Sequence, residues 1–163
     1  MKILIAYYSR TGMNESICKM LQSKLECDIE SIIDTKNRKG IWGFITGGFA
    51  AAFRIKPRIK PVEKDPANYD LMIIATPIWA GVMAPAMRTY VFDNKTKFKK
   101  VAFVSVSGSG ADNQKAVTDF ENLSNLKVFA SLLLSEKEVK QGIHQEKLEN
   151  FVKNILVEKT EIK

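Results

Sequence analysis

The sequence predicts an α/β protein whose three layers are built around a doubly wound parallel sheet of five strands, in the order 2-1-3-4-5. Two observations lead to this prediction. Short apolar segments alternate along the chain with segments whose apolar residues recur every three or four positions, which is typical of strands separated by amphipathic helices. The length of 163 residues and the hydrophobic content of 45% are those of an ordinary globular chain, so we expect one domain over residues 1–163.

Five segments have the patterns of strands. Residues 2–8 (KILIAYY) are nearly all apolar, as expected of a strand buried on both faces of a parallel sheet. Residues 27–33 (CDIESII) interleave charged and apolar side chains, which is typical of an edge strand. The third, fourth and fifth strands are predicted at residues 69–75, 101–106 and 128–134. Because connections between parallel strands are right-handed, helices should cover both faces of this sheet.

Four stretches that follow these strands have the apolar spacing of helices. The first stretch begins at Glu15, and the second is opened by Pro85, which fits the first turn of a helix. The apolar stripes consist of Ile17, Met20, Leu21 and Leu25; Met83, Met87, Tyr90 and Val91; Ala116, Val117, Phe120 and Leu123; and Leu148, Phe151, Val152, Ile155 and Leu156. In each stripe the side chains fall on one helix face, which we expect to pack on the sheet.

The net charge of +7 raises the question of a nucleic-acid or acidic membrane partner. The basic residues gather in the loop-like stretches 36–39, 54–60 and 95–100, and no helix-turn-helix, zinc finger or RNA-binding aromatic motif accompanies them. We therefore expect a solvated basic surface rather than a nucleic-acid interface. The amino terminus enters the first strand without a signal pattern, and no apolar run is long enough to span a bilayer, so a cytoplasmic location is expected.

The two cysteines, Cys18 and Cys27, do not form a CxxC pair, and His144 is the only histidine. This pattern does not indicate a metal site. Cys18 falls in the first predicted helix and Cys27 at the start of the second predicted strand, so we interpret both as packing residues rather than redox thiols.

Residues 9–14 (SRTGMN) join the carboxyl end of the first strand to the first helix. The first turn of a helix leaves backbone N–H groups without partners, and the helix dipole places partial positive charge there, so this turn is suited to a phosphate. Gly12 lets the backbone approach a ligand closely, while Ser9, Thr11 and Asn14 can donate side-chain hydrogen bonds to phosphate oxygens. The alternative stays open that these are helix-capping residues without any ligand.

Two further loops should meet this turn, because ligands of doubly wound sheets lie beyond the carboxyl ends of the strands, where the strand order reverses. In residues 76–81 (TPIWAG), Trp79 offers a flat apolar face on which a ring could stack, or else it covers the edge of the core. Residues 107–112 (SGSGAD) are rich in glycine and can pass close to a planar ligand. Asn113 stands where a dinucleotide fingerprint would have its third glycine, so we do not interpret this loop as that fingerprint.

In order and spacing, these three loops resemble those of the flavodoxin family, and the likeness covers nearly the whole chain. The chain is similar to short-chain members, because its fifth strand leaves no room for the insertion of the long-chain type. The resemblance implies FMN as the cofactor. The residues that would hold its phosphate are Ser9, Arg10, Thr11, Gly12, Met13 and Asn14. Those that would flank the isoalloxazine are Thr76, Pro77, Ile78, Trp79, Ala80 and Gly81, with Ser107, Gly108 and Gly110 along its other edge.

Three features depart from the family pattern. Asn14 replaces the final hydroxyl of the phosphate loop, and the loop after the fourth strand lacks an aromatic residue, which would leave one side of the flavin open to substrate or solvent. Electron-carrying members of the family are strongly acidic, whereas this chain is basic. A positive field favours the anionic reduced flavin and repels the basic docking surfaces that acidic members use.

The resemblance implies electron transfer, with a redox partner protein or a small-molecule acceptor. Two alternatives stay open: an FMN-dependent oxidoreductase that reduces a quinone or a similar acceptor, and a cofactor-free interaction or nucleic-acid-binding module with the same fold. A response regulator is excluded because Thr76, Ser9 and Arg10 stand where its acidic residues would be, and a low-molecular-weight phosphatase is excluded because the first loop has no cysteine. No catalytic side chain is predicted.

Residues 40–53 (GIWGFITGGFAAAF) form an apolar excursion between the second and third strands, bracketed by basic stretches. Two interpretations stay open. The first is a crossover helix, interrupted at Gly47 and Gly48, that packs on the sheet. The second is an exposed apolar flap over the flavin, or a patch flanked by basic residues that contacts a membrane quinone or a partner protein, with Trp42 and Phe44 as contact residues.

Overall fold

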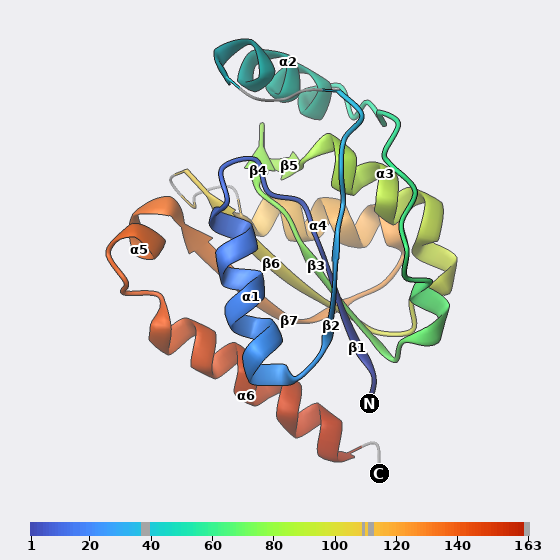
Figure 1. Ribbon diagram of the computed structural model, residues 1–163, viewed down its shortest axis with the longest axis vertical. Coiled ribbons are helices and arrows are strands. Elements are labelled where there is room, and N and C mark those ends of the chain that lie inside the picture. The colour runs from blue at the N-terminus through green and yellow to red at the C-terminus, as the bar shows by residue number, and fades with distance from the viewer. Residues whose placement is uncertain (37–39, 109, 111–112, 162–163) are drawn as a thin grey trace.

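The computed structural model describes residues 1–36, 40–108, 110 and 113–161, and for residues 40–42, 44, 160 and 161 it describes the backbone alone (Figure 1). A parallel sheet with the strand order β2-β1-β3-β6-β7 forms the centre of the molecule. Its strands are β1 (Ile3–Tyr7), β2 (Asp28–Ser31), β3 (Leu71–Ala75), β6 (Val101–Ser107) and β7 (Val128–Ser135). With β6 and β7 as the fourth and fifth strands, the predicted order 2-1-3-4-5 is confirmed.

Helices cover both faces of the sheet and form two cores, as predicted (Figure 1). On one face, α1 (Met13–Leu25) and α6 (Gln145–Glu161) bury Ile17, Leu21 and Phe151 against the strands. On the other face, α3 (Pro85–Asn94) and α4 (Asn113–Ser124) bury Tyr90 and Phe120. The central strands are buried throughout, because helices lie above and below them.

Several short elements were not predicted from the sequence. They are the hairpin strands β4 (Ile78–Trp79) and β5 (Val82–Met83), the helix α5 (Glu136–Lys140), and two 3-10 turns at Pro66–Asn68 and Lys95–Lys97. At the edge of the sheet, the buried carboxylate of Glu30 in β2 accepts the backbone N–H groups of Glu63 and Lys64, each at 3.2 Å. These bonds hold the returning chain against the edge strand.

The apolar excursion folds as one continuous helix, α2 (Gly40–Ala52), so the predicted interruption at Gly47 and Gly48 is wrong. Its packing also differs from the first interpretation. The helix lies against β4, β5 and α3, beyond the carboxyl edge of the sheet, and within the described chain it adds no residue to either core cluster (Figure 1). Packing against the hairpin outweighs the low helix propensity of the two glycines.

The chain segments that lead into and out of this excursion lie side by side. Asp34 and Ile59 form an isolated antiparallel bridge, and the Thr35 N–H donates to the carbonyl of Arg58 at 3.1 Å. The Thr89 hydroxyl of α3 donates to the carbonyl of Pro57 at 2.8 Å. The chain therefore leaves and rejoins the body of the protein at one place. None of the described helices is both long enough and apolar enough to cross a membrane.

Both cysteines are packing residues, as interpreted from the sequence. Cys18 is fully buried in the core under α1, and this burial raises the pKa of its thiol. Cys27 is half-buried, and burial raises the pKa of its thiol to about 11. Neither group is therefore a thiolate near neutral pH, which is the form that redox chemistry requires.

The start of α5 predicts a specific pH dependence of stability. Glu138 accepts the Ser135 N–H at 2.7 Å and pairs with Lys147 at 2.6 Å, and these contacts, led by Lys147, lower the pKa of its carboxyl from 4.5 to about 2. Because the folded state holds the carboxylate, its contribution is complete above about pH 4.5 and is lost as the pH falls toward 2.

We expect Glu138→Gln to flatten the pH dependence of the free energy of unfolding across this window, since the amide can still contact Ser135 but does not titrate. Urea unfolding of both proteins at a series of pH values between about 2 and 6 measures the effect. The same slope in both proteins would show that Glu138 does not titrate with folding.

Candidate functional site

The register of the sheet brings the three predicted loops to one edge. Tyr7 at the end of β1 pairs with Ala75 at the end of β3, and Ala75 pairs with Val104 of β6. Just beyond these ends, the Tyr8 N–H donates to the carbonyl of Ala75 at 2.9 Å and the Thr76 N–H donates to that of Val104 at 3.0 Å. The loops that follow β1, β3 and β6 therefore start side by side.

The first loop turns into α1 at Gly12, whose φ of 87° is a left-handed conformation that favours glycine. No side chain caps this helix end. The Gly12 N–H donates to the Ser9 hydroxyl oxygen at 3.1 Å, so Ser9 shapes the loop, while Thr11 and Gly12 are exposed. A methyl group at Gly12 would meet no atom within 4 Å, which means that the turn is open to a ligand.

Asn14 has a different place from the one expected. Its side chain is only 3% exposed, its Nδ2 donates to the carbonyl of Val106 at 3.3 Å, and its Oδ1 accepts the N–H of Val106 at 3.1 Å. Both polar atoms of the amide thus bond to β6, a role that the expected side-chain contact with phosphate did not include. Only the backbone N–H of Asn14 lies in the first turn of α1.

The second loop is a hairpin. Its strands β4 and β5 are joined by Ala80 (φ 50°) and Gly81 (φ 77°), two positive values that define a type I′ turn. Thr76 is fully buried at the base, where its hydroxyl donates to the carbonyl of Pro77 at 3.0 Å and accepts the N–H of Ala84 at 3.2 Å. A glycine as second turn residue between two apolar pairs was the signal for this hairpin in the sequence.

Trp79, in strand β4 of the hairpin, lies between the first loop and α2. Its ring meets the edge of Tyr8, with the centroids 5.8 Å apart and an interplanar angle of 83°. A methyl group on Gly47 of α2 would lie 2.8 Å from Cζ3 of Trp79, so the ring lies directly against the helix backbone. Trp79 thus covers the edge of one core, as one of the two interpretations held, and it is still partly exposed.

The third loop is partly described. The Ser107 hydroxyl donates to Asn113 Oδ1 at 2.7 Å, and Asn113 Nδ2 donates to the carbonyl of Leu134 at 3.2 Å, which ties the start of α4 to the ends of β6 and β7. Gly108 is exposed, and Gly110 has a φ of 77°. Ser109, Ala111 and Asp112 lie outside the described residues.

A buried ion pair joins α3 to α4 close to the hairpin. Arg88 of α3 and Asp119 of α4 are joined at 2.6 Å, and both side chains are buried. Arg54, just after α2, places its Nε 3.6 Å from the other oxygen of Asp119. Above this pair, Ala80 and Gly81 line a cavity of about 350 Å³ together with α4.

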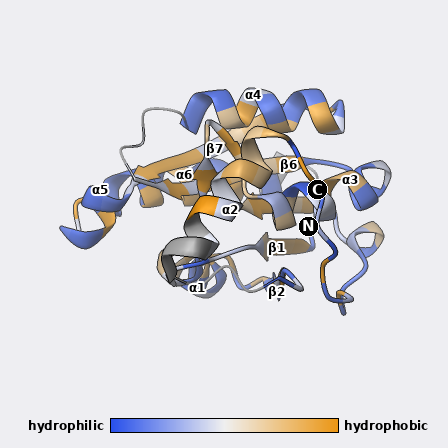
Figure 2. Ribbon diagram, turned by 90° about the horizontal axis from the view of Figure 1, so that it is seen from above, coloured by the Kyte–Doolittle hydropathy of each residue, from blue (hydrophilic) through white to orange (hydrophobic). Residues whose placement is uncertain are grey.

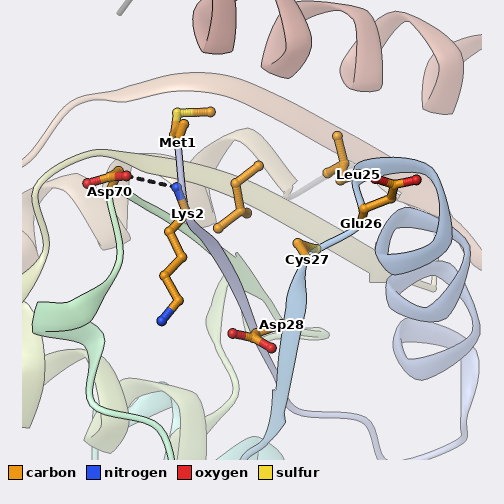
Figure 3. A pocket seen from close by; sticks show the side chains of 8 residues that line it. Met1, Lys2, Leu25, Glu26, Cys27, Asp28 and Asp70 are labelled. Carbon is orange, nitrogen blue, oxygen red and sulfur yellow. Dashed lines mark hydrogen bonds between the residues drawn. The ribbon is translucent and has the colours of Figure 1, made fainter.

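A larger cavity, of about 650 Å³, lies at the opposite edge of the sheet, at the amino-terminal ends of the strands (Figure 3). Two of the carboxylates that line it have hydrogen-bond partners: Asp70 accepts the Lys2 N–H at 2.8 Å, and Asp28 accepts the Tyr69 hydroxyl at 2.8 Å. Burial, followed by this bond, raises the pKa of Tyr69 to about 12. The cavity is remote from the three loops, so we do not assign the functional site to it.

The contact between Trp79 and Gly47 predicts different effects on stability for two neighbouring substitutions. Gly48→Ala should raise the free energy of unfolding by about 0.5–1 kcal/mol, because its methyl group has open space and alanine favours a helix. Gly47→Ala should lose this gain and shift the tryptophan fluorescence, because the ring of Trp79 must move. Equal stabilisation in urea unfolding would place the ring elsewhere.

The bonds of Asn14 predict a structural role. Asn14→Ala should lower the free energy of unfolding by about 1–3 kcal/mol, because it leaves the buried N–H and carbonyl of Val106 without their partner. The control Thr11→Ala, at an exposed position in the same loop, should change stability by less than about 0.5 kcal/mol. Urea unfolding compares the two, and equal losses would contradict the assignment.

No family model matches the sequence, and no curated protein matches it significantly. Solved structures do match the fold. A flavoprotein from Lactobacillus acidophilus in complex with FMN matches with a TM-score of 0.70 and 23% identity, over 86% of this chain and 97% of that chain. A flavodoxin from Fusobacterium nucleatum bound to flavin mononucleotide matches with a TM-score of 0.60 and 13% identity, over 96% of this chain and 98% of that chain.

A larger enzyme contains the same architecture. The rubredoxin oxygen:oxidoreductase of Desulfovibrio gigas matches with a TM-score of 0.54 and 11% identity, over 96% of this chain and 36% of that chain. Together with the strand order and the two covered faces of the sheet, these matches show that the chain has the flavodoxin-like fold.

Proposed function

We propose that the chain binds FMN where its three loops meet and that it takes part in electron transfer. One observation carries the proposal: the amino terminus of α1 has no side-chain cap and opens at the carboxyl edge of the sheet, beside the loops after β3 and β6. A phosphate completes such a helix end through its N–H groups and dipole. The two neighbours with bound flavin support FMN as the ligand.

The first loop would bind the phosphate mainly through its backbone. The N–H groups of Met13 and Asn14 lie in the first turn of α1, and the exposed Thr11 can add its hydroxyl. Arg10 adds a positive charge to the same loop. Ser9 would act by shaping the turn, and the buried Asn14 side chain would keep α1 in place on β6. The first loop and the amino terminus of α1 would thus be rigid before the ligand binds.

The other two loops would flank the ring. Residues 77–81 of the hairpin would form one side of the ring site. There α2 packs on Trp79 at Gly47, and the buried Thr76 holds the base of the hairpin through its bond to Ala84. Ser107, Gly108 and Gly110 would lie along the other edge, where the exposed Gly108 presents only backbone. When bound, FMN supplies one- and two-electron chemistry, and the chain orients it and excludes water. No acid or base side chain is needed.

The proposed phosphate contact predicts that a negative charge in the first loop weakens the binding of FMN but not that of riboflavin. Thr11→Asp should weaken FMN binding about tenfold or more, because a carboxylate then faces the phosphate, while riboflavin, which lacks the phosphate, should bind as before. Quenching of flavin fluorescence during titration measures both affinities. The control Thr96→Asp carries the same charge on an exposed 3-10 turn and should leave both affinities unchanged. If the native chain binds no FMN, the proposal is wrong.

Reduction of the flavin-loaded protein under argon separates the two redox roles. Uptake of electrons in two separate one-electron steps supports a carrier, whereas direct two-electron bleaching by NAD(P)H supports an oxidoreductase that reduces a quinone or a similar acceptor. A protein that stays colourless with excess FMN but binds nucleic acid in a salt-sensitive way would favour the cofactor-free alternative.

A further inference from the structure

The outward face of α2 is apolar. Ile45, Phe49 and Phe53 are spaced four residues apart, so they form one stripe along and just past the helix, and they are 53%, 59% and 66% exposed. The rings of Phe49 and Phe53 lie 4.4 Å apart between centroids. The inward face is formed by small buried residues, Gly47 and Ala51. Among the described side chains of this helix, the large ones thus lie on the exposed face, the reverse of an ordinary surface helix. Figure 2 shows apolar residues along the described part of α2.

Basic residues border this stripe. Residues 54–60 (RIKPRIK) contribute four cations, and no acidic residue occurs between Gly40 and Val62. Lys56 places its Nζ 3.0 Å from the ring centroid of Phe92 on α3, which is itself partly exposed. The exposed phenyl rings and the cations are therefore continuous around α2, the following turn and α3.

We propose that the outward face of α2 together with residues 54–60 is a docking surface for an anionic lipid bilayer. Aromatic and branched apolar side chains beside lysine and arginine are the combination that binds the boundary between lipid headgroups and acyl chains. With 13 residues, α2 is too short to cross a bilayer, so it lies along the surface. The net charge of +7 acts in the same direction.

The charges disfavour a second copy of the chain as the occupant. A two-fold symmetric dimer through this face would bury residues 54–60 of both copies in one interface, and each copy would add four cations and no acidic residue from residues 40–62. Such like charges repel across an interface. An anionic lipid surface neutralises them instead.

The position of this surface links it to the proposed redox site. The helix α2 lies on the β4–β5 hairpin, and Trp79 contacts it at Gly47, so a docked molecule presents its hairpin side to the lipid. An acceptor dissolved in the membrane would then reach the flavin. This consequence rests on the proposed function, whereas lipid docking itself does not, so vesicle binding without FMN and FMN titration without vesicles test the two separately.

Co-sedimentation with vesicles tests the surface. We expect the chain to bind vesicles of phosphatidylglycerol and phosphatidylcholine at low salt, to bind them less at high salt, and to bind pure phosphatidylcholine at least about tenfold more weakly. The double variant Phe49→Ser/Phe53→Ser should lower the partition coefficient about tenfold or more. Its control, Ile143→Ser, removes a side chain that is 62% exposed in the turn after α5 and should bind like the native chain.

The charges are tested in the same way. Lys56→Gln/Lys60→Gln should lower the partition coefficient about tenfold, and Lys137→Gln/Lys153→Gln, at exposed positions elsewhere, should change it much less. All these positions are exposed, so circular dichroism should show intact folds. Failure to bind anionic vesicles, equal losses in the control variants, or a dimer in sedimentation that Phe49→Ser/Phe53→Ser dissociates would each overturn the proposal.

Discussion

The amide of Asn14 holds the proposed site together. Its two hydrogen bonds to Val106 fix the start of α1 to the end of β6, across the position of β3 in the sheet. The open helix end therefore cannot shift relative to the loop after β6. A short side chain that carries both a donor group and an acceptor atom can satisfy both backbone atoms of a strand residue, and its burial makes these bonds costly to break.

A second constraint is the contact between a tryptophan and a helix that has no side chain at that point. Gly47 lets the backbone of α2 lie on the ring of Trp79, and the type I′ turn at Ala80 and Gly81 turns the hairpin so that this ring faces α2. The chain accepts a positive φ at a non-glycine residue, Ala80, which costs about 1 kcal/mol. The wall beside the proposed flavin site is thus built where the hairpin, which packs on one core, meets a helix that adds no described residue to either core.

The central fold was predictable because its signals are local. Leu71–Ala75 is uniformly apolar since both of its faces are buried, and Phe120 and Phe151 each belong to an apolar stripe that recurs with the period of a helix. The fate of Asn14 was not predictable, because an asparagine at a helix start has the same appearance whether it binds phosphate or a distant strand. The predicted helix interruption at Gly47 and Gly48 was wrong for a related reason: Gly47 packs against Trp79, about thirty residues away, and a local pattern does not show this contact. Of the proposed site, the placement of the three loops followed from topology, whereas the hairpin required its turn geometry.

The bridge between Asp34 and Ile59 has a consequence for how this protein can change over time. Because the ends of the excursion already touch, its length and composition can vary without altering the register of any strand, and the entropic cost of a longer insertion grows only slowly. The surface above the proposed site is therefore a separable module. Relatives with one and the same sheet can differ in what they dock against, since the module can be exchanged while the framework that positions the loops is kept.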